Sequence, residues 1–329
     1  MTHAPTIEEI RTTRRALQSY IASTPLFRWV GPAIASHLAP DAEVLLKLEL
    51  FQQSGTFKAR GALANMLRLS DEQCARGVTT VSAGNHAIAV AYAAASLGVS
   101  AKVVMLASAN PARIAAARSY GAEVIIGGDG PSSFALAEDI ARSEGRALIH
   151  PFEGKEVALG TGTLGLELHE QAGPLDAVVI AIGGGGLAGG VSAALRQLQP
   201  SCEIYGVEPV GADVMSRSLA AGEALRMPDV RTIADSMAPP MTLPYAFSLC
   251  RNHLTGIVTV TDDAICEAMA LLFADCKLAV EPAGAAAAAA LLGPLRDRLA
   301  DKRVALIVCG ANIDIDSFAA YVRRGSRAD

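Results

Sequence analysis

No apolar stretch of this sequence is long enough to cross a membrane. The longest, residues 283–292, is mostly alanine and falls well short of the roughly 20 apolar residues that a membrane-spanning helix needs. Residues 1–15 are polar and include acidic side chains, which excludes a signal or transit peptide. The net charge of -5 gives no electrostatic reason to expect nucleic acid or an anionic membrane as a partner. We therefore expect a soluble, cytoplasmic protein.

Cysteine is sparse, and its six positions are scattered along the chain. No two of them stand at the spacing of a metal site or a redox pair, and a chain of 329 residues needs no disulfides to fold. The sequence therefore predicts no bound metal and plain reduced thiols for five of the six, with Cys309 set apart by its neighbours. The six are Cys74, Cys202, Cys250, Cys266, Cys276 and Cys309.

The chain does contain a large apolar fraction, arranged in short alternating segments. Hydrophobic residues make up 51% and charged residues 19%, which favours a large core over disorder. Short β-branched runs predict buried strands at 78–82, 101–105, 123–126, 177–182, 203–207 and 304–309. Amphipathic stretches predict helices at 87–97, 111–120, 134–144, 163–171 and 187–198, and the alanine tract 283–290 predicts a closely packed one. This alternation is typical of an α/β fold with parallel sheets covered on both faces.

Four consecutive glycines follow the predicted strand 177–182 and open a predicted helix. The segment consists of Gly183, Gly184, Gly185, Gly186 and Leu187. Without side chains the backbone can approach a ligand closely, and the helix N-terminus offers free N–H groups to an anion. The dinucleotide-binding pattern and the Walker lysine are both absent. A tight turn without a ligand needs fewer glycines, so the segment predicts a phosphate site.

A lysine lies in the first turn of a predicted helix, 57–69, where the helix dipole disfavours a positive charge. Lys58 could simply be solvated, as most lysines are. Lysine is also the residue that binds an aldehyde cofactor covalently. A phosphate site and such a lysine in one chain together suggest pyridoxal phosphate.

Two further loops follow predicted strands, where α/β proteins place ligands. The first is formed by Ser82, Ala83, Gly84, Asn85 and His86. It could bind a carboxylate through its backbone N–H groups while Asn85 contacts a cofactor, or it could be a plain turn capped by Asn85. In the second loop, 309–312, the Cys309 thiol could bond a ring nitrogen or could be a buried structural group.

These segments, in this order, resemble the threonine/serine dehydratase group of pyridoxal-phosphate enzymes, which has the tryptophan-synthase-β-like fold. The resemblance extends from Ile7 to Tyr321 and so covers nearly the whole chain. It rests on residues 56–58, 82–86, 183–187 and 309–312, which are similar to the family's lysine motif, Asn-His loop, phosphate loop and final Cys-Gly-Ala-Asn segment. Further landmarks are 24–26, 150–152, 206–209 and 281–284.

The resemblance implies a role for each residue of these segments. Lys58 would bind the cofactor covalently and later act as acid and base. The other implied cofactor contacts are Phe57 and Glu281 near the ring, Asn85 at the ring hydroxyl, Gly183 to Leu187 at the phosphate, and Cys309 at the pyridine nitrogen. Residues Ser82 to His86 would hold the carboxylate of a small amino-acid substrate.

The resemblance also implies an architecture and a reaction. A small α/β domain of residues 53–154 would stand beside a larger one formed by 1–52 and 155–329, in a homodimer or homotetramer. Because nothing follows Asp329, we expect no C-terminal regulatory domain. The reaction would remove water and then ammonia from a β-hydroxy amino acid to leave a 2-oxo acid. A neutral thiol at the ring nitrogen suits loss of a β-leaving group better than transamination.

Several residues depart from the family's usual pattern. Ile88 and Thr161 replace glutamines, and Ser236 replaces a glycine in a segment that runs on through Met237 to Met241. Methionine adapts to irregular apolar groups, so these changes predict a substrate side chain larger or more apolar than that of serine. The same residues could equally pack the loop alone. Threonine is therefore the first candidate substrate, followed by aryl β-hydroxy amino acids such as phenylserine.

Other activities remain alternatives at this point. They are an amino-acid racemase, a β-replacement synthase and a non-catalytic pyridoxal-phosphate carrier. Ala83 stands where racemases of the family have a proton-transferring serine, which argues against the first. Relatives with a divalent cation use a glutamate, here Glu208, and a second carboxylate where this chain has Val214, so we expect no tight metal site.

Overall fold

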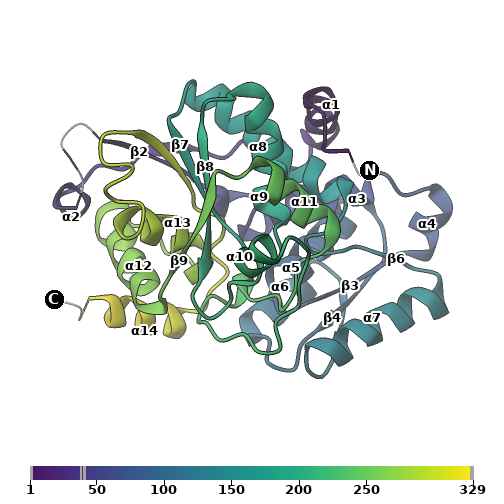
Figure 1. Cartoon of the computed structure of the whole chain (residues 1–329). Coiled ribbons are helices and arrows are strands. Elements are labelled where there is room, and N and C mark those ends of the chain that lie inside the picture. The colour runs from purple at the N-terminus through teal and green to yellow at the C-terminus, as the bar shows by residue number, and fades with distance from the viewer. Residues whose placement is uncertain (1–2, 38, 40–41, 327–329) are drawn as a thin grey trace.

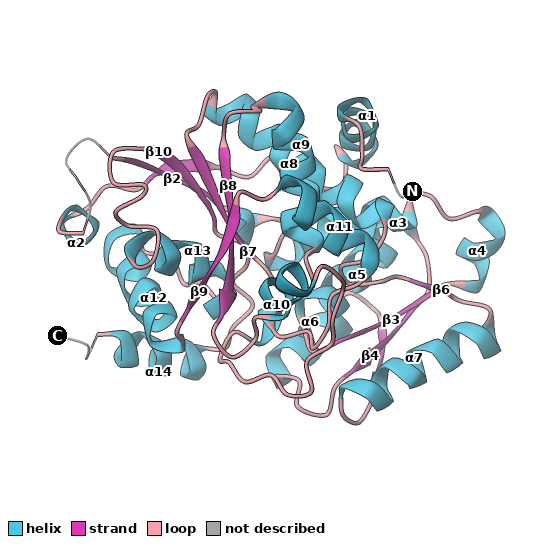
Figure 2. Cartoon of the chain, viewed as in Figure 1, coloured by secondary structure: helices cyan, strands magenta, loops and turns pink. Residues whose placement is uncertain are grey.

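The chain is built around two β-sheets of unequal size, seen in the computed structural model (Figures 1 and 2). The structure describes residues 3–37, 39 and 42–326. The larger sheet has six strands in the order β1-β2-β10-β7-β8-β9, and every neighbouring pair is parallel except β1 with β2. Their bounds are β1 (Leu26–Arg28), β2 (Glu43–Lys47), β7 (Ala177–Ala181), β8 (Glu203–Pro209), β9 (Gly256–Val260) and β10 (Arg303–Ile307).

The smaller sheet has four parallel strands in the order β5-β4-β3-β6. They are β3 (Val78–Ser82), β4 (Ala101–Met105), β5 (Glu123–Ile126) and β6 (Ala147–Leu148). All four lie within residues 53–154 and all strands of the larger sheet lie outside this range, which supports the proposed division into two domains. Asp329, on which the expected lack of a regulatory domain rests, lies outside the described residues.

Helices cover the sheets. Figure 2 shows α12, α13 and α14 together on one side of the larger sheet and α8, α9 and α11 on the other. The helices are α1 (Ile7–Leu17), α2 (Pro32–Ala35), α3 (Lys58–Met66), α4 (Asp71–Arg76), α5 (Asn85–Leu97), α6 (Pro111–Ser119), α7 (Gly130–Glu144), α8 (Lys155–Ala172), α9 (Gly186–Leu198), α10 (Val214–Ala221), α11 (Pro244–His253), α12 (Asp262–Cys276), α13 (Pro282–Leu292) and α14 (Ile315–Gly325). Short 3₁₀ turns are η1 (Glu49–Phe51), η2 (Gln53–Gly55) and η3 (Asp235–Met237). The predicted α/β class with two parallel-sheet units is thus confirmed.

The alanine tract forms the buried helix that the sequence predicts. Helix α13 begins with Pro282, whose fixed φ suits the first helical position, and Ala283 to Leu291 are all buried. Alanine costs no side-chain entropy and lets neighbouring elements come close, so α13 packs against β7, β8, β9 and β10 at once. No helix in the described part of the chain has the length and apolar character needed to cross a membrane.

The ends of three strands place the candidate residues around shared cavities. Residues 83–84 follow β3, which ends at Ser82, residues 183–185 follow β7, and Cys309 follows β10. Parallel strands present their carboxyl ends at one edge of a sheet, which is where α/β proteins bind ligands. Here the edges of the two sheets face each other, and helix α3 carries Lys58 into the space between them. All six cysteines are free thiols, as predicted.

Candidate active site

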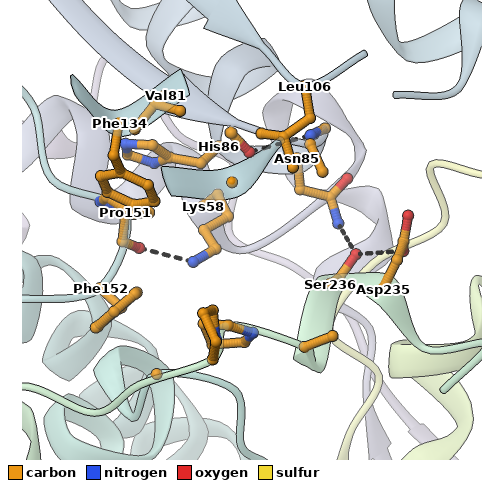
Figure 3. Close-up of a pocket in the computed structure, with 18 of the residues that line it drawn as sticks. Lys58, Val81, Asn85, His86, Leu106, Phe134, Pro151, Phe152, Asp235 and Ser236 are labelled. Carbon is orange, nitrogen blue, oxygen red and sulfur yellow. Dashed lines mark hydrogen bonds between the residues drawn. The ribbon is translucent and has the colours of Figure 1, made fainter. Parts of the chain in front are cut away.

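Lys58 is the first residue of α3, and its amine faces the interior (Figure 3). Nζ donates a hydrogen bond to the backbone oxygen of Pro151 at 2.7 Å and lies 5.0 Å from the centre of the Phe57 ring. The side chain is half-buried, and the surface that it exposes lines the cavities described below. A solvated lysine is therefore the wrong interpretation of this position.

The surroundings of Lys58 favour its neutral form. Burial lowers the pKa of its amine from the usual 10.5 to about 8, against a smaller opposing effect of Cys309 and Glu281. A lysine with such a lowered pKa supplies a larger fraction of nucleophilic, proton-accepting amine near neutral pH than a solvated one. The position thus suits both covalent bonding to an aldehyde and proton transfer.

The glycine loop, residues Gly183 to Gly186, is packed so closely that side chains on Gly184 and Gly186 would clash with Phe152. A Cβ atom on Gly184 would lie 2.3 Å from Cγ of Phe152, and one on Gly186 would lie 2.7 Å from the Phe152 backbone oxygen. Gly185 has a φ of +95°, in the left-handed region that favours glycine. Helix α9 begins at Gly186 without a side-chain cap, so its first N–H groups are available to an anion. The loop fits a phosphate group.

Asn85 does not cap α5; its carboxamide points across to the larger sheet instead. Nδ2 donates to Oε1 of Glu281 at 2.7 Å and to Oγ of Ser236 at 3.1 Å. Oδ1 accepts from Nδ2 of Asn312 at 2.8 Å. The interpretation of residues 82–86 as a plain capped turn is therefore wrong, because the amide group is held within a polar network at the cavity.

Glu281 and Arg113 form the charged part of this network. Nη2 of Arg113 donates to Oε2 of Glu281 at 3.1 Å, and Nη1 pairs with Asp235. Burial raises the pKa of Glu281 to about 7, although the Arg113 guanidinium opposes this effect. Arg113 comes from α6, beside the smaller sheet, whereas its carboxylate partners belong to segments of the larger unit. These ion pairs therefore join the two units at the rim of the site.

The Cys309 thiol is buried at the far end of the site. Its Sγ donates to the backbone oxygen of Ala283 at 3.3 Å, and only 3% of the residue is exposed. Burial raises the pKa of this thiol far above its ordinary value, so it stays neutral. A neutral thiol can share a hydrogen bond with a pyridine nitrogen without protonating it.

Two adjoining cavities bring these groups together. The outer cavity has a volume of about 170 Å³ and lies between the 82–86 loop and the loop that runs from Asp235 to Met241. The inner cavity lies between the glycine loop and Cys309. The residues that line both are Lys58, Asn85, Phe152, Gly184 and Ser236. Lys58 therefore stands at the junction, within reach of both an inner and an outer ligand.

Histidines near the junction are poor proton carriers. Burial, aided by the charge of Lys58, lowers the pKa of His86 to about 3 and that of His150 to about 4. Nε2 of His86 lies 3.0 Å from the backbone oxygen of Ile149. Both rings are neutral at physiological pH and would gain a proton only in acid. Lys58 therefore remains the residue predicted to transfer protons in the outer cavity.

The outer cavity has an apolar wall formed by Leu106, Phe134, Pro240 and Met241, of which only the loop residues were predicted from the sequence. Phe134 of α7 and Leu106, after β4, line it together with Pro240 and Met241. Ile88, which we expected to contribute, packs in the core beneath the smaller sheet with 2% of its surface exposed and is not part of the cavity wall. Its exchange for the usual glutamine therefore makes no apolar pocket, because this face of α5 points away from the cavity.

Arg113 was missed, although a signal was present. The Asn110–Pro111 helix start puts it in the first turn of α6, where a positive charge opposes the helix dipole, as at Lys58. Met237 is buried against the inner cavity rather than the outer one. Of the two methionines of this loop, only Met241 lines the outer cavity and can contact a substrate side chain there.

Glu208, the expected remnant of a cation site, binds backbone instead. Its carboxylate accepts from N of Met215 at 2.8 Å and from N and Oγ of Ser216 at 2.8 and 2.6 Å, and so holds the start of α10. Asp213 pairs with Arg217 at 2.7 Å. The prediction that the protein needs no divalent cation stays a prediction.

Comparisons with known proteins agree with this geometry. Residues 17–310 match the family described as pyridoxal-phosphate dependent enzyme. The chain is 48% identical to a phenylserine dehydratase of Ralstonia pickettii over 98% of both chains. It is 34% identical to an L-threonine ammonia-lyase of Thermotoga maritima over 97% of this chain and 79% of the other. The solved structure of maize serine racemase superposes with a TM-score of 0.91 at 32% identity and covers 99% of each chain.

Proposed function

Because the chain belongs to the family of pyridoxal-phosphate dependent enzymes, we propose that it is a dehydratase for β-hydroxy amino acids with bulky, apolar side chains. The leading substrate is phenylserine, which would first lose water and then take up one water molecule as ammonia is released, so that the net products are phenylpyruvate and ammonia. Threonine, first in the sequence analysis, becomes the second candidate. The relative at 48% identity, a phenylserine dehydratase, supports this order.

The observation that carries the proposal is the apolar wall of the outer cavity. Phe134, Leu106, Pro240 and Met241 line the same cavity as Lys58, and Figure 3 shows Phe134 and Leu106 beside the space into which the Lys58 amine points. An aryl group lying there would be buried among apolar atoms, at roughly 25 cal/mol per Å² of surface removed from water. The small, polar side chain of serine would leave the same wall without a partner.

The residues present fit pyridoxal phosphate. The glycine loop would hold its phosphate, Lys58 would bind its aldehyde carbon covalently, and Cys309 would face its ring nitrogen. Asn85 and Glu281 would lie at the edge of the ring that carries the hydroxyl group. Phe57 would pack against the ring. When bound, the cofactor supplies an electron sink for the charge left when the α-proton is removed.

The protein's own groups would then orient the substrate and move its protons. Backbone N–H groups of residues 82–86 would bind the carboxylate and so fix the α-carbon near Lys58. The neutral amine of Lys58 would accept the α-proton, helped by its lowered pKa. The β-hydroxyl group would leave as water, and hydrolysis would release ammonia and the 2-oxo acid. The neutral Cys309 thiol would leave the ring nitrogen unprotonated, which favours β-elimination.

A racemase is the strongest alternative, because the maize relative of known structure is a serine racemase. Racemisation needs a proton donor on the face opposite the lysine. Ala83 lines the outer cavity with a methyl group, which cannot transfer a proton. A β-replacement synthase or a non-catalytic carrier is less favoured, because nothing in either role calls for the apolar wall.

The proposal extends to the state of the protein in the cell. Large apolar side chains stay exposed at Phe27, Phe51 and Phe273, with 41%, 54% and 44% of their surfaces accessible. Association with further copies of the chain would cover such groups, which supports a homodimer or homotetramer. The six free thiols support a cytoplasmic location, where thiols stay reduced.

Product analysis tests the proposed reaction. Purified protein loaded with pyridoxal phosphate and given phenylserine should release phenylpyruvate and ammonia in equal amounts, measured by mass spectrometry and an ammonia assay. Chiral chromatography of the remaining substrate should show no inversion at the α-carbon. Accumulation of the α-epimer would favour the racemase, and formation of benzaldehyde and glycine would show carbon–carbon cleavage instead of dehydration.

A further inference from the structure

Ser236 occupies an unusual place in the site. It lies in η3 and, with Lys58, Asn85, Phe152 and Gly184, is one of five residues that line both cavities. Among these five side chains, Ser236 alone carries a hydroxyl group.

The Ser236 hydroxyl has a hydrogen to spare. Its Oγ accepts from Nδ2 of Asn85 at 3.1 Å. Its own hydrogen can reach only two acceptors in the described structure, Oδ1 of Asp235 at 3.4 Å and Oε2 of Glu281 at 3.5 Å (Figure 3 shows the first two of these three contacts). Both distances are at the long limit for a hydroxyl donor, whose usual range ends near 3.0 Å. The hydrogen is therefore free to turn toward a better acceptor at the cavity junction.

The chemistry of the cofactor indicates which acceptor this is. Pyridoxal phosphate carries its phosphate arm and its ring hydroxyl on the two ring carbons that flank the aldehyde carbon. With the aldehyde carbon at Lys58 and the phosphate at the glycine loop, the ring hydroxyl falls on the remaining side. Apart from Lys58, the glycine loop and Cys309, the polar residues that line the inner cavity are Asn85, Ser236 and Glu281, and Asn85 bonds to both of the others.

The amide group of Asn85 alone is poorly suited to binding the ring hydroxyl oxygen of the cofactor. One N–H of Asn85 is already held by Glu281 at 2.7 Å, so only the N–H that now points at Ser236 can turn to a ligand. The buried Glu281 carboxyl group is close by and would repel an anionic ring oxygen whenever it is ionised. A second neutral donor would offset that repulsion.

We propose that the Ser236 hydroxyl donates a second hydrogen bond to the ring hydroxyl oxygen of the bound cofactor, beside that of Asn85. The inference rests on the proposed attachment of pyridoxal phosphate at Lys58 but not on the identity of the substrate. The bond favours the ionised form of the ring oxygen, which gives the lysine-bound cofactor its yellow colour.

The test uses the resting enzyme without substrate. Ser236→Ala should raise the dissociation constant of pyridoxal phosphate about tenfold, the effect expected for one hydrogen bond to a charged oxygen, and should shift absorbance from the visible to the near-ultraviolet band. Ser236→Thr keeps the hydroxyl group and should retain both properties. Ser248→Ala is the matched control, because that hydroxyl bonds only to the backbone of Tyr245 in α11.

A double-mutant cycle separates this bond from a general disturbance of the loop. With a cofactor analogue that lacks the ring hydroxyl, wild type and Ser236→Ala should bind with the same dissociation constant. An equal penalty for Ser236→Ala with both cofactors, or no penalty with either, would overturn the proposal. A wild type without any visible band would instead refute cofactor attachment at Lys58, which is a different failure.

Discussion

Replacing Lys58 with alanine should remove the visible absorption band of the bound cofactor and lower turnover by at least about a thousandfold. The variant loses the covalent bond to the cofactor and the base that accepts the α-proton, and a positioned general base alone contributes about 10²–10⁴-fold. Both nearby histidines have strongly lowered pKa values and are therefore weak bases that replace Lys58 poorly. Absorption spectra and 2-oxo acid assays provide the measurement.

A lysine at the surface provides the control. Lys155→Ala removes an exposed side chain that pairs with Glu9 and should leave both readouts unchanged. Borohydride reduction followed by peptide mapping should place the cofactor on Lys58, and a label on another lysine would refute the assignment. In cofactor-free wild type, the band should return faster as the pH rises toward about 8, because deprotonation of Lys58 supplies the reactive amine.

Replacing Arg60 with methionine should destabilise the protein by about 3–5 kcal/mol, although Arg60 lines neither cavity of the site. Its guanidinium is fully buried and bonds both oxygens of Glu49 at 2.8 and 2.7 Å and Oε2 of Glu167 at 3.1 Å. Without Arg60, the buried carboxylates of Glu49 and Glu167 would share a single fully buried cation, Lys47. Urea unfolding, monitored by circular dichroism, measures the loss.

An exposed ion pair gives the matched control. Arg11→Ala breaks a contact with Glu8 on the surface of α1 and should change the free energy of unfolding by less than about 1 kcal/mol. If the cost at Arg60 is an unpaired buried charge, adding Glu49→Gln should recover part of it. A loss at Arg60 no greater than that at Arg11 would contradict this account of how α3, and with it Lys58, is held in place.

Three of the four strands of the smaller sheet were predictable from short β-branched runs, whereas the two-residue strand β6 was not predicted. Residues 78–82, 101–105 and 123–126 form strands within the predicted bounds. Helix α8 was placed too late, at 163 instead of Lys155, because its glycines weaken the helical signal. Those glycines serve tertiary packing: a Cβ on Gly160 would lie 2.4 Å from the backbone oxygen of Arg60. Such a cause is visible only once the fold is known.

The site was predictable where a residue's type and its local position agree. Lys58 places a cation at a helix start, where it is disfavoured, and the glycine loop has more glycines than a tight turn needs. Both departures from local preference indicate a ligand. Phe134 breaks no rule, since it looks like any apolar residue on α7, and only the fold brings it to the cavity. Ile88 shows the reverse error, because its unusual identity reflects core packing.

The relative specificity for three substrates tests the central claim most directly. Steady-state kinetics should give a kcat/KM for L-threo-phenylserine at least tenfold above that for L-serine, with L-threonine between them. One methylene group in an apolar pocket already changes discrimination by about 1–3 kcal/mol, and an aryl group against Phe134 and Met241 should exceed the lower end of that range. If L-serine has the highest kcat/KM of the three, the apolar wall does not bind the substrate side chain and the proposed specificity is wrong.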